Sequence, residues 1–588
     1  MIVDREPRLT GAEVLGATAV SWLASVVVFA YFADRIGLTI APRPVLAASI
    51  AAAAAMFLWL RRGAVWRPGG IAAFTSVIGV MLVWLAWLAW PELLPPGGGS
   101  DLAHHLQLVD YIDRHRQLVH DPTVEWYLGE MVHYTPGAHL LSSLAGRWIG
   151  SDGFHAVYPV VALTVAIKAG FVFLIAERMA GLKARTTTDG LAGLKARTTP
   201  VELAGLKDGT TTPFCILAVL LLFLPRAFFV GSFARYSYIA QVVSELFAVA
   251  MWWALVAWDE RPTRLEPLIV FAIAGVATFL SWPIWIGPPL VALALLAITR
   301  RDLTASGKLS ALALGALPIL VVAAVHTAGR AGWARIVGVG TDTPLPTWND
   351  FTWWFIALSA AGMVAVSRVR RGRVTALLLF ACAVQAAALY GIAKANGAAV
   401  PYMAIKMAYF AIYPLAVAGA FAVALAWQFF AARVESRLSF PVKPDPRLGT
   451  QAVAWMLILV LAIVIGTATL RARMPKPVVS ESLYLAGEWA RAHVDPACVD
   501  YVVAHDNTAY WLHLSVLGNR RMSDRTADDR TFIPRDGIVR WINQGGLPYA
   551  IADLGTIPRD VLESTDEIAR FGSAVVIKRR GETNCDRR

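Results

Sequence analysis

The sequence has few charged residues for its length. Only 16% of its 588 residues are Asp, Glu, Lys or Arg, whereas 57% are hydrophobic. A chain this poor in charge cannot cover itself as a soluble globular protein, and its mean hydropathy of +0.55 indicates a lipid environment. The net charge of +12 does not indicate nucleic-acid binding, because Lys and Arg lie mostly in short loops between apolar runs, where they orient membrane proteins.

Cysteine is also scarce. Of four cysteines, Cys215 and Cys382 fall inside apolar runs, whereas Cys498 and Cys585 lie near the C-terminus. If that region is outside the cytoplasm, Cys498 and Cys585 could pair, because disulfides persist in oxidising compartments. A convincing P-loop or dinucleotide fingerprint is missing as well. We therefore expect no redox or nucleotide cofactor.

Long apolar runs dominate what is present. About thirteen runs of about 16 to 25 residues are long enough to cross a bilayer as helices. The first is Val14 to Phe32, the last is Val453 to Leu470, and two runs meet at the Pro-rich break Ser281 to Pro289. Met1 to Glu13 is polar without a cleavable signal-peptide pattern, so the first run is expected to remain as a span. These runs predict an α-helical polytopic membrane protein.

The spans and loops predict two regions. Residues 1–470 form a multi-span module with a large outer loop at 91–155 and a cytoplasmic loop at 178–212. The cytoplasmic loop holds three copies of an AGLKxxTT unit, which indicates a recent duplication in a tolerant loop. The basic loops agree broadly, though not strictly, with a cytoplasmic N-terminus, and an odd number of spans then places 471–588 outside.

Residues 471–588 predict a small extracytoplasmic α/β domain. The pattern is helical from Ser480 to His493, and short apolar strand candidates follow at Val499 to Val503, Tyr549 to Ala552 and Ala574 to Ile577. A domain of roughly 110 residues can bury its own core. Because no nucleophile set is recognisable in it, we expect an acceptor-binding or structural module.

The outer loop carries the first candidate catalytic group. Gly97 to Ser100 breaks the preceding helix, and Asp101 begins a segment with one apolar side, which predicts a helix on the membrane surface. Asp101 and His105 are four residues apart, so they share a face that overlaps the apolar one. Polar groups in such a place need a reason, and catalysis is one. Further polar residues of the loop are candidates for substrate contact: His104, Glu130, Tyr134 and His139.

Each of these residues also has a structural interpretation. Asp101 could equally be a helix N-cap that follows Ser100. The two neighbouring histidines could be interfacial polar residues, and a metal site is weakly supported because no third or fourth ligand is evident. The Tyr134 to His139 motif, YTPGAH, could be a turn that starts the next helix.

A second signal is a set of cations at the outer ends of spans, against the orientation bias. Snorkelling explains any one of them, but the set is what an anionic lipid phosphate needs. Lys406 stands out because Tyr402 and Tyr409 lie on neighbouring turns as the chain enters a span. A comparable polar segment contains Arg235, Tyr236, Tyr238, Gln241 and Glu245. The full set of cations is Arg226, Arg235, Arg330, Arg335, Lys394 and Lys406.

Together these residues resemble the GT-C glycosyltransferases. The likeness rests on a loop Asp after the third span, a Y-x-P-G-x-H motif at the next span, and a late Lys with Tyr neighbours. In architecture the chain is most similar to the actinobacterial arabinofuranosyltransferases that prime galactan, which have a YPPG motif and a C-terminal outer domain. Thr135 replaces the second residue of that motif, and Asp101 lacks the paired acidic residue of other GT-C branches.

The resemblance implies inverting transfer of a sugar, arabinofuranose among the candidates, from a polyprenyl-phosphate donor at the outer face of a bacterial cytoplasmic membrane. Asp101 would be the general base, with His105 orienting it or the acceptor and Glu130 as a weaker second carboxylate. Acceptors of this kind are glycans, glycolipids or proteins, and a divalent metal remains open. Donor and phosphate contacts would come from Lys406, Tyr402, Arg226, Arg235, Tyr236, Gln241 and Lys394.

Two other functions compete with transfer. A lipid or sugar transporter or flippase would also have many spans, and the break at Ser281 to Pro289 fits the interrupted helices of transporters. However, no similarity between the two halves is visible, and the polar residues gather at the outer boundary. A non-catalytic sensor or assembly protein would instead act through its C-terminal domain.

Overall fold

The computed structural model describes residues 9–96, 100–180, 211–328, 346–369, 372–437, 476–503, 506–512, 541, 547–581 and 585. Most of the described chain is helical, and one small sheet lies near the C-terminus. Eight described helices are long and apolar enough to cross a membrane, and further apolar helices are shorter. The prediction of a helical multi-pass membrane protein with a small C-terminal α/β domain is confirmed.

The helices follow the predicted apolar runs closely. Helices α8 and α14 are short, and α8 ends eight residues before the predicted end of its run at Phe229, because Pro225 and a turn interrupt it. The run Val453 to Leu470 and residues 181–210 of the repeat loop lie outside the described residues. The apolar helices are α1 (Gly11–Arg35), α2 (Pro42–Leu60), α3 (Pro68–Ala89), α7 (Gly153–Ala180), α8 (Thr211–Leu221), α10 (Ile239–Glu260), α11 (Glu266–Ser281), α12 (Gly287–Thr299), α13 (Ala305–Thr327), α14 (Trp353–Ser367), α15 (Arg373–Ala395) and α16 (Tyr402–Arg437).

Helix α10 is the centre of the bundle. It is mostly apolar and is buried along nearly its whole length against α7, α11 and α15, and it includes the fully buried Trp252 and Trp253. Helix α3 lies at the edge, where Val80 and Val83 are about 70% exposed. An apolar surface of this kind is what a membrane span presents to lipid.

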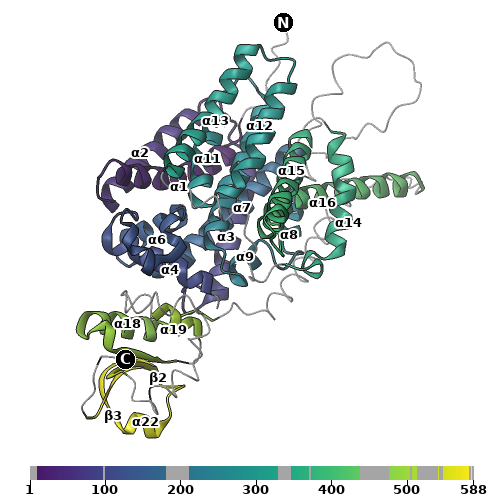
Figure 1. Ribbon diagram of the computed structural model, residues 1–588. Helices are drawn as coiled ribbons and strands as arrows, with labels where there is room; N and C mark the ends of the chain where they lie inside the picture. Colours follow the sequence, from purple (N-terminus) through teal and green to yellow (C-terminus); the bar gives the residue numbers. More distant parts are fainter. Residues whose placement is uncertain are drawn as a thin grey trace, which may run out of the picture.

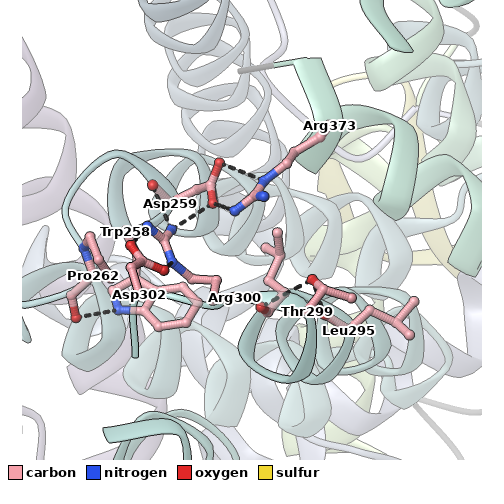
Figure 2. A network of polar contacts seen from close by, with 9 residues as sticks. Trp258, Asp259, Pro262, Leu295, Thr299, Arg300, Asp302 and Arg373 are labelled. Atoms are coloured by element: carbon pink, nitrogen blue, oxygen red, sulfur yellow. Dashed lines mark hydrogen bonds and ion pairs between the residues drawn. The ribbon is translucent and has the colours of Figure 1, made fainter. Parts of the chain in front are cut away.

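Buried ion pairs tie the helices at the end of the bundle where α10 finishes. Asp259 accepts a bond from Arg300 Nη1 at 2.7 Å and also binds Arg373, while Arg300 reaches Asp302 at 2.6 Å. Figure 2 shows how these side chains converge from α10, α12 and α15. Each of these charges therefore has an opposite charge beside it in a region that excludes water.

Helix α4 (Ser100–His115) and helix α6 (Gly137–Trp148) lie at the opposite end, which we call the α4 end. The apolar side of α4 is buried, and the helix packs on α6, α7 and the C-terminal α19 (Asp506–Leu512). Protein therefore covers the apolar side that the sequence analysis assigned to the membrane surface. A Cβ atom on Gly137 would lie 2.4 Å from Ser281 Oγ, so glycine lets α6 start directly against α11.

The C-terminal residues form a separate lobe beside α4 and α6 (Figure 1). Its sheet has the order β1-β2-β4-β3, with β1 (Val499–Val502) parallel to β2 (Tyr549–Asp553) and the other pairs antiparallel. Helix α18 (Glu481–His493), β1, β2 and β4 (Ala574–Arg579) confirm the predicted elements. Strand β3 (Thr565–Phe571) and helix α22 (Arg559–Glu563) were not predicted. β3 is an edge strand with mostly exposed, polar residues, so it carries little apolar signal.

Charged side chains join this lobe to the membrane module. Arg114 of α4 binds Glu488 of α18 at 2.5 Å, and Arg491 of α18 binds Asp110 of α4 at 3.0 Å. Nearby, the Tyr484 hydroxyl donates to Asp152 at 2.6 Å. Helix α18 therefore holds the C-terminal half of α4, the helix whose first turn carries Asp101.

A disulfide between Cys498 and Cys585 closes a loop of 87 residues in the lobe. Loss of such a crosslink is expected to destabilise the lobe by about 4 to 5 kcal/mol on the chain-entropy estimate. The double variant Cys498→Ser/Cys585→Ser should therefore be cut by protease in the lobe at least tenfold faster than the parent. Cys382→Ser, a change at a buried free cysteine, is the control. Equal cleavage rates for the double variant and its parent would contradict this prediction.

Candidate active site

Asp101 lies in the first turn of α4, which begins at Ser100. The helix therefore starts one residue too early for Asp101 to be its N-cap. The Asp101 side chain is 48% exposed, and its Oδ2 atom is 3.9 Å from Nε2 of the buried His105, one turn later. A carboxylate that is open to solvent on one side and faces an imidazole on the other can accept a proton from a bound hydroxyl.

A second histidine supports His105 from behind. Nδ1 of His105 is 2.9 Å from Nε2 of His139, and Tyr134 packs edge-on against both rings. Burial lowers the pKa of His105 and places that of His139 well below its usual value. Both imidazoles are therefore neutral at physiological pH and share a hydrogen bond, which fixes the ring that faces Asp101. His139, predicted to contact substrate, is buried in this pair.

His104 and Glu130 form a separate contact on the same side of α4. His104 Nδ1 is 2.9 Å from a carboxylate oxygen of Glu130. Burial alone would raise the Glu130 pKa, but the bond with His104 outweighs it and lowers the pKa to about 2. Glu130 is thus ionised and already occupied, so it is a poorer candidate base than Asp101.

Lys406 lies in the first turns of α16 and is buried. Its ammonium donates one hydrogen bond, to Gln241 Oε1 at 2.8 Å. Three rings surround it, which we call the tyrosine cage: Nζ is 2.7 Å from the centroid of Tyr238, 5.0 Å from Tyr402 and 5.3 Å from Tyr409. Among the described residues no carboxylate binds Lys406 directly. Aromatic faces attract a cation but do not neutralise it.

Asp101 and Lys406 belong to one electrostatic environment. Besides burial, the positive charge of Lys406 contributes to the lowered pKa of His105. Burial raises the pKa of Tyr238, and the Asp101 charge adds to that rise. The structure therefore brings the candidate base from α4 and the candidate cation from α16 to the same end of the bundle.

The other predicted site residues differ in their contacts and exposure. Tyr236 stacks on Tyr238 at 5.4 Å between ring centroids, and Arg235 lies over Tyr236 while binding Asp350 at 3.0 Å. Arg226 is exposed and has no ion pair with a described residue. Lys394 lies over the Tyr390 ring and donates to the carbonyls of Ala398 and Ala399. Arg330 and Arg335 lie outside the described residues.

The segment that leads to the tyrosine cage contains strained backbone. Phe229 and Ser237, which flank helix α9 (Val230–Ala234), have φ values of 52° and 60°. Such conformations cost about 1 to 3 kcal/mol each for residues with side chains and concentrate at functional sites. The Ser232 hydroxyl donates to the Phe229 carbonyl at 2.6 Å and helps to hold this bend.

Two residues of the site region had no role predicted from sequence. Lys168 of α7 donates to Glu245 Oε2 at 2.5 Å, and the Tyr413 hydroxyl donates to the same oxygen at 2.6 Å. All three side chains are fully buried. Lys168 is the one charged residue in the apolar run from Val157 to Ile175, and a lone charge inside a span is a signal that could have identified it.

An apolar cavity of about 660 Å³ lies against the same first turns of α16. Its walls come from α15, α16 and the segment before α14, and small apolar side chains predominate. Residues from this stretch of α16 line it, so cavity and Lys406 share one helix. Lining residues include Phe351, Leu379, Cys382, Ile405, Met407 and Ala408.

Within the described part of the chain, no three His, Cys, Asp or Glu side chains gather in a group that could hold a metal ion. The two histidine contacts, His105 with His139 and His104 with Glu130, are pairs. The polar groups that the site offers are the exposed carboxylates of Asp101 and Glu130, the buried imidazoles of His105 and His139, and the caged ammonium of Lys406.

No protein-family model and no curated protein matches the chain. Among solved structures it is similar to ArnT from Cupriavidus metallidurans in the apo state, with 14% identity and a TM-score of 0.47 over 86% of this chain and 98% of that one. It is also similar to the Archaeoglobus fulgidus oligosaccharyltransferase. The apo form gives 12% identity and a TM-score of 0.44, and the form tethered to an acceptor peptide gives 13% and 0.41, each over 82% of this chain and 69% of that one.

Proposed function

We propose that this protein is a membrane glycosyltransferase that moves a sugar from a polyprenyl-phosphate donor to an acceptor hydroxyl. One observation carries the proposal: Lys406, a buried ammonium without a bound carboxylate, shares its electrostatic environment with the half-exposed Asp101. A buried cation is costly unless an anion meets it. A lipid phosphate supplies that anion, and a carboxylate supplies the base.

The reaction proceeds with inversion in a single displacement. Asp101 takes the proton of the acceptor hydroxyl, and the acceptor oxygen forms a bond to the anomeric carbon of the sugar. The bond between that carbon and the donor phosphate oxygen breaks, and its electron pair leaves with polyprenyl phosphate. The phosphate changes from a monoanion to a dianion, and Lys406 stabilises the added charge.

The surroundings of Lys406 fit a lipid-linked donor. Lys406 lies in the first turns of α16, and the apolar cavity along α15 and α16 offers walls suited to a polyprenyl chain. Arg235, exposed beside Tyr236, is placed to meet a phosphate oxygen from the solvent side. These features favour a donor with one charged group and a long apolar tail.

The finer assignment follows the family resemblance. We propose arabinofuranose as the first sugar to test, with a cell-envelope glycan, a glycolipid or a protein as the acceptor. Reaction at the outer face of a bacterial cytoplasmic membrane, with the N-terminus inside and the C-terminal lobe outside, would bring the lobe to the acceptor. In this proposal the lobe contacts the C-terminal half of α4, about 14 to 20 Å along the helix from Asp101, and guides the acceptor toward that carboxylate.

The proposal is tested with purified protein in vesicles that contain a labelled polyprenyl-phosphate sugar, with arabinofuranose, mannose and glucose donors run separately. We expect label to appear on an added cell-envelope glycan with one of the donors and free polyprenyl phosphate to accumulate in equal amount. If the intact donor crosses the bilayer and no donor yields a labelled product, the protein is a flippase and the proposal fails.

A further inference from the structure

A chain of buried polar side chains runs inward from Lys406 through three helices. Lys406 of α16 donates to Gln241 Oε1, and Gln241 Nε2 donates to Glu245 Oε1 at 3.1 Å, both residues being on α10. Glu245 then accepts from Lys168 of α7. Every member is at most 2% exposed. In a membrane protein such a chain is expensive to bury and needs a function.

The two hydrogen-bond partners of Gln241 fix the orientation of its side-chain amide. A side-chain amide has one accepting oxygen and one donating nitrogen. The ammonium of Lys406 can only donate, and the ionised carboxylate of Glu245 can only accept. The opposite amide orientation would place N–H groups against the ammonium and an oxygen against the carboxylate. Gln241 therefore has one favourable orientation, with its oxygen toward Lys406.

Lys168 and Tyr413 hold the Glu245 carboxylate in the position that this amide orientation requires. Lys168 Nζ at 2.5 Å and the Tyr413 hydroxyl at 2.6 Å both reach Glu245 Oε2, which leaves Oε1 for Gln241. Without Lys168, Glu245 Oε2 would keep only the Tyr413 hydroxyl as a donor, and the carboxylate would be free to turn Oε1 away from Gln241. The bond from Gln241 Nε2 to Glu245 would then no longer direct the Gln241 oxygen toward Lys406.

The same arrangement leaves the ammonium of Lys406 available. The ammonium has three N–H groups, and Gln241 accepts from one of them. The other two have no oxygen or nitrogen acceptor among the described residues. Because the Lys168 and Glu245 charges cancel, the chain contains one unmatched positive charge, on Lys406. A neutral amide holds the ammonium in place without neutralising it, which a carboxylate at position 241 would do.

We propose that Lys168 and Glu245 are positioning residues that orient the Gln241 amide, and that this amide holds Lys406 for the donor phosphate without cancelling its charge. The inference rests on the proposed function, since it assigns these residues to the donor side of that reaction. A purely structural ion pair would affect stability but not the affinity for a phosphate.

The first test is Gln241→Glu, which keeps the side-chain size and gives Lys406 a carboxylate partner. We expect the KM for the polyprenyl-phosphate sugar to rise at least tenfold and the binding of polyprenyl phosphate, measured by native mass spectrometry, to weaken similarly. The melting temperature is expected to fall, because the second oxygen of the new carboxylate lies against Glu245 Oε1, so lipid binding is compared at a temperature where both proteins are folded. Wild-type KM and lipid binding in this variant would overturn the inference.

The second test removes the supporting pair while keeping the net charge. In Lys168→Met/Glu245→Met, Gln241 loses its acceptor, and we expect KM for the donor to rise about tenfold with a smaller change in kcat. The matched control is Asp259→Asn/Arg300→Gln, which removes a buried ion pair about 20 Å further along α10 (Figure 2). If both double variants lose stability equally and keep wild-type KM, the pair is structural and the inference is wrong.

The wild-type protein distinguishes a failure of the proposed function from a failure of the positioning role. If it transfers no sugar from any polyprenyl-phosphate donor, the proposed function fails. The native mass spectrometry arm then still reports whether Gln241→Glu alters the binding of polyprenyl phosphate itself. If wild type transfers sugar and the variants at 168, 241 and 245 match it in KM, only the positioning role fails.

Discussion

Replacing Asp101 by Asn is expected to lower sugar transfer by a factor of about 10² to 10⁴, the usual contribution of a general base. Asn has the same shape but cannot accept the acceptor's proton. The fold should be retained, because Asp101 is half exposed and its contact with His105 is long, at 3.9 Å. The measurement is kcat with a saturating polyprenyl-phosphate donor in purified protein, with the melting temperature recorded alongside.

Asp121→Asn is the matched control for this change. Asp121 is an exposed carboxylate in the same loop region and, among the described residues, bonds its near neighbour Thr123. The control should turn over at the wild-type rate. Turnover by the Asp101 variant within threefold of wild type would remove Asp101 from the mechanism, and another group would then have to accept the proton.

Lys406→Met should have the second large effect, a loss of about 10² to 10³ in kcat. The estimate is that for removing one preorganised group that stabilises charge developing in the transition state. Methionine keeps the length of the side chain within the tyrosine cage but cannot meet the phosphate dianion. Lys406→Arg is expected to recover little, because a planar guanidinium does not fit the geometry built for a compact ammonium.

Stability distinguishes this loss from misfolding. The ammonium is buried without a carboxylate partner, so its removal should leave the melting temperature unchanged or raise it. Lys308→Met, at a half-buried lysine that bonds the Ile298 carbonyl, serves as the control and should retain full activity. An inactive Lys406 variant that also unfolds at a much lower temperature would mean that Lys406 supports the fold and not the reaction.

The fold was largely predictable because lipid imposes length and polarity on each span. Long apolar runs located the described long helices, and short apolar runs located β1, β2 and β4. The position of α4 was not predictable, because an amphipathic helix has the same pattern whether lipid or protein covers its apolar side. β3 was missed for a related reason: exposed edge strands need few apolar residues.

The candidate site was predictable only where its residues are close in sequence. The i, i+4 spacing of Asp101 and His105 indicated a shared face, and the structure places them 3.9 Å apart. In contrast, Lys168 and Glu245 are 77 residues apart and meet only because α7 packs against α10. Spacing along one helix cannot show a pair made by two helices, so the inner part of the polar chain required the structure.

The contacts between α4 and α18 also set an order of events during synthesis. Arg114 and its partner Glu488 are 374 residues apart, so the ribosome makes almost the whole chain before α4 gains this support. The helix that carries Asp101 is among the first parts to leave the ribosome and among the last to be locked. A chain that ends before α18 would therefore keep the packing of α4 against α6 and α7 but would lack the ion pairs of Arg114 and Asp110.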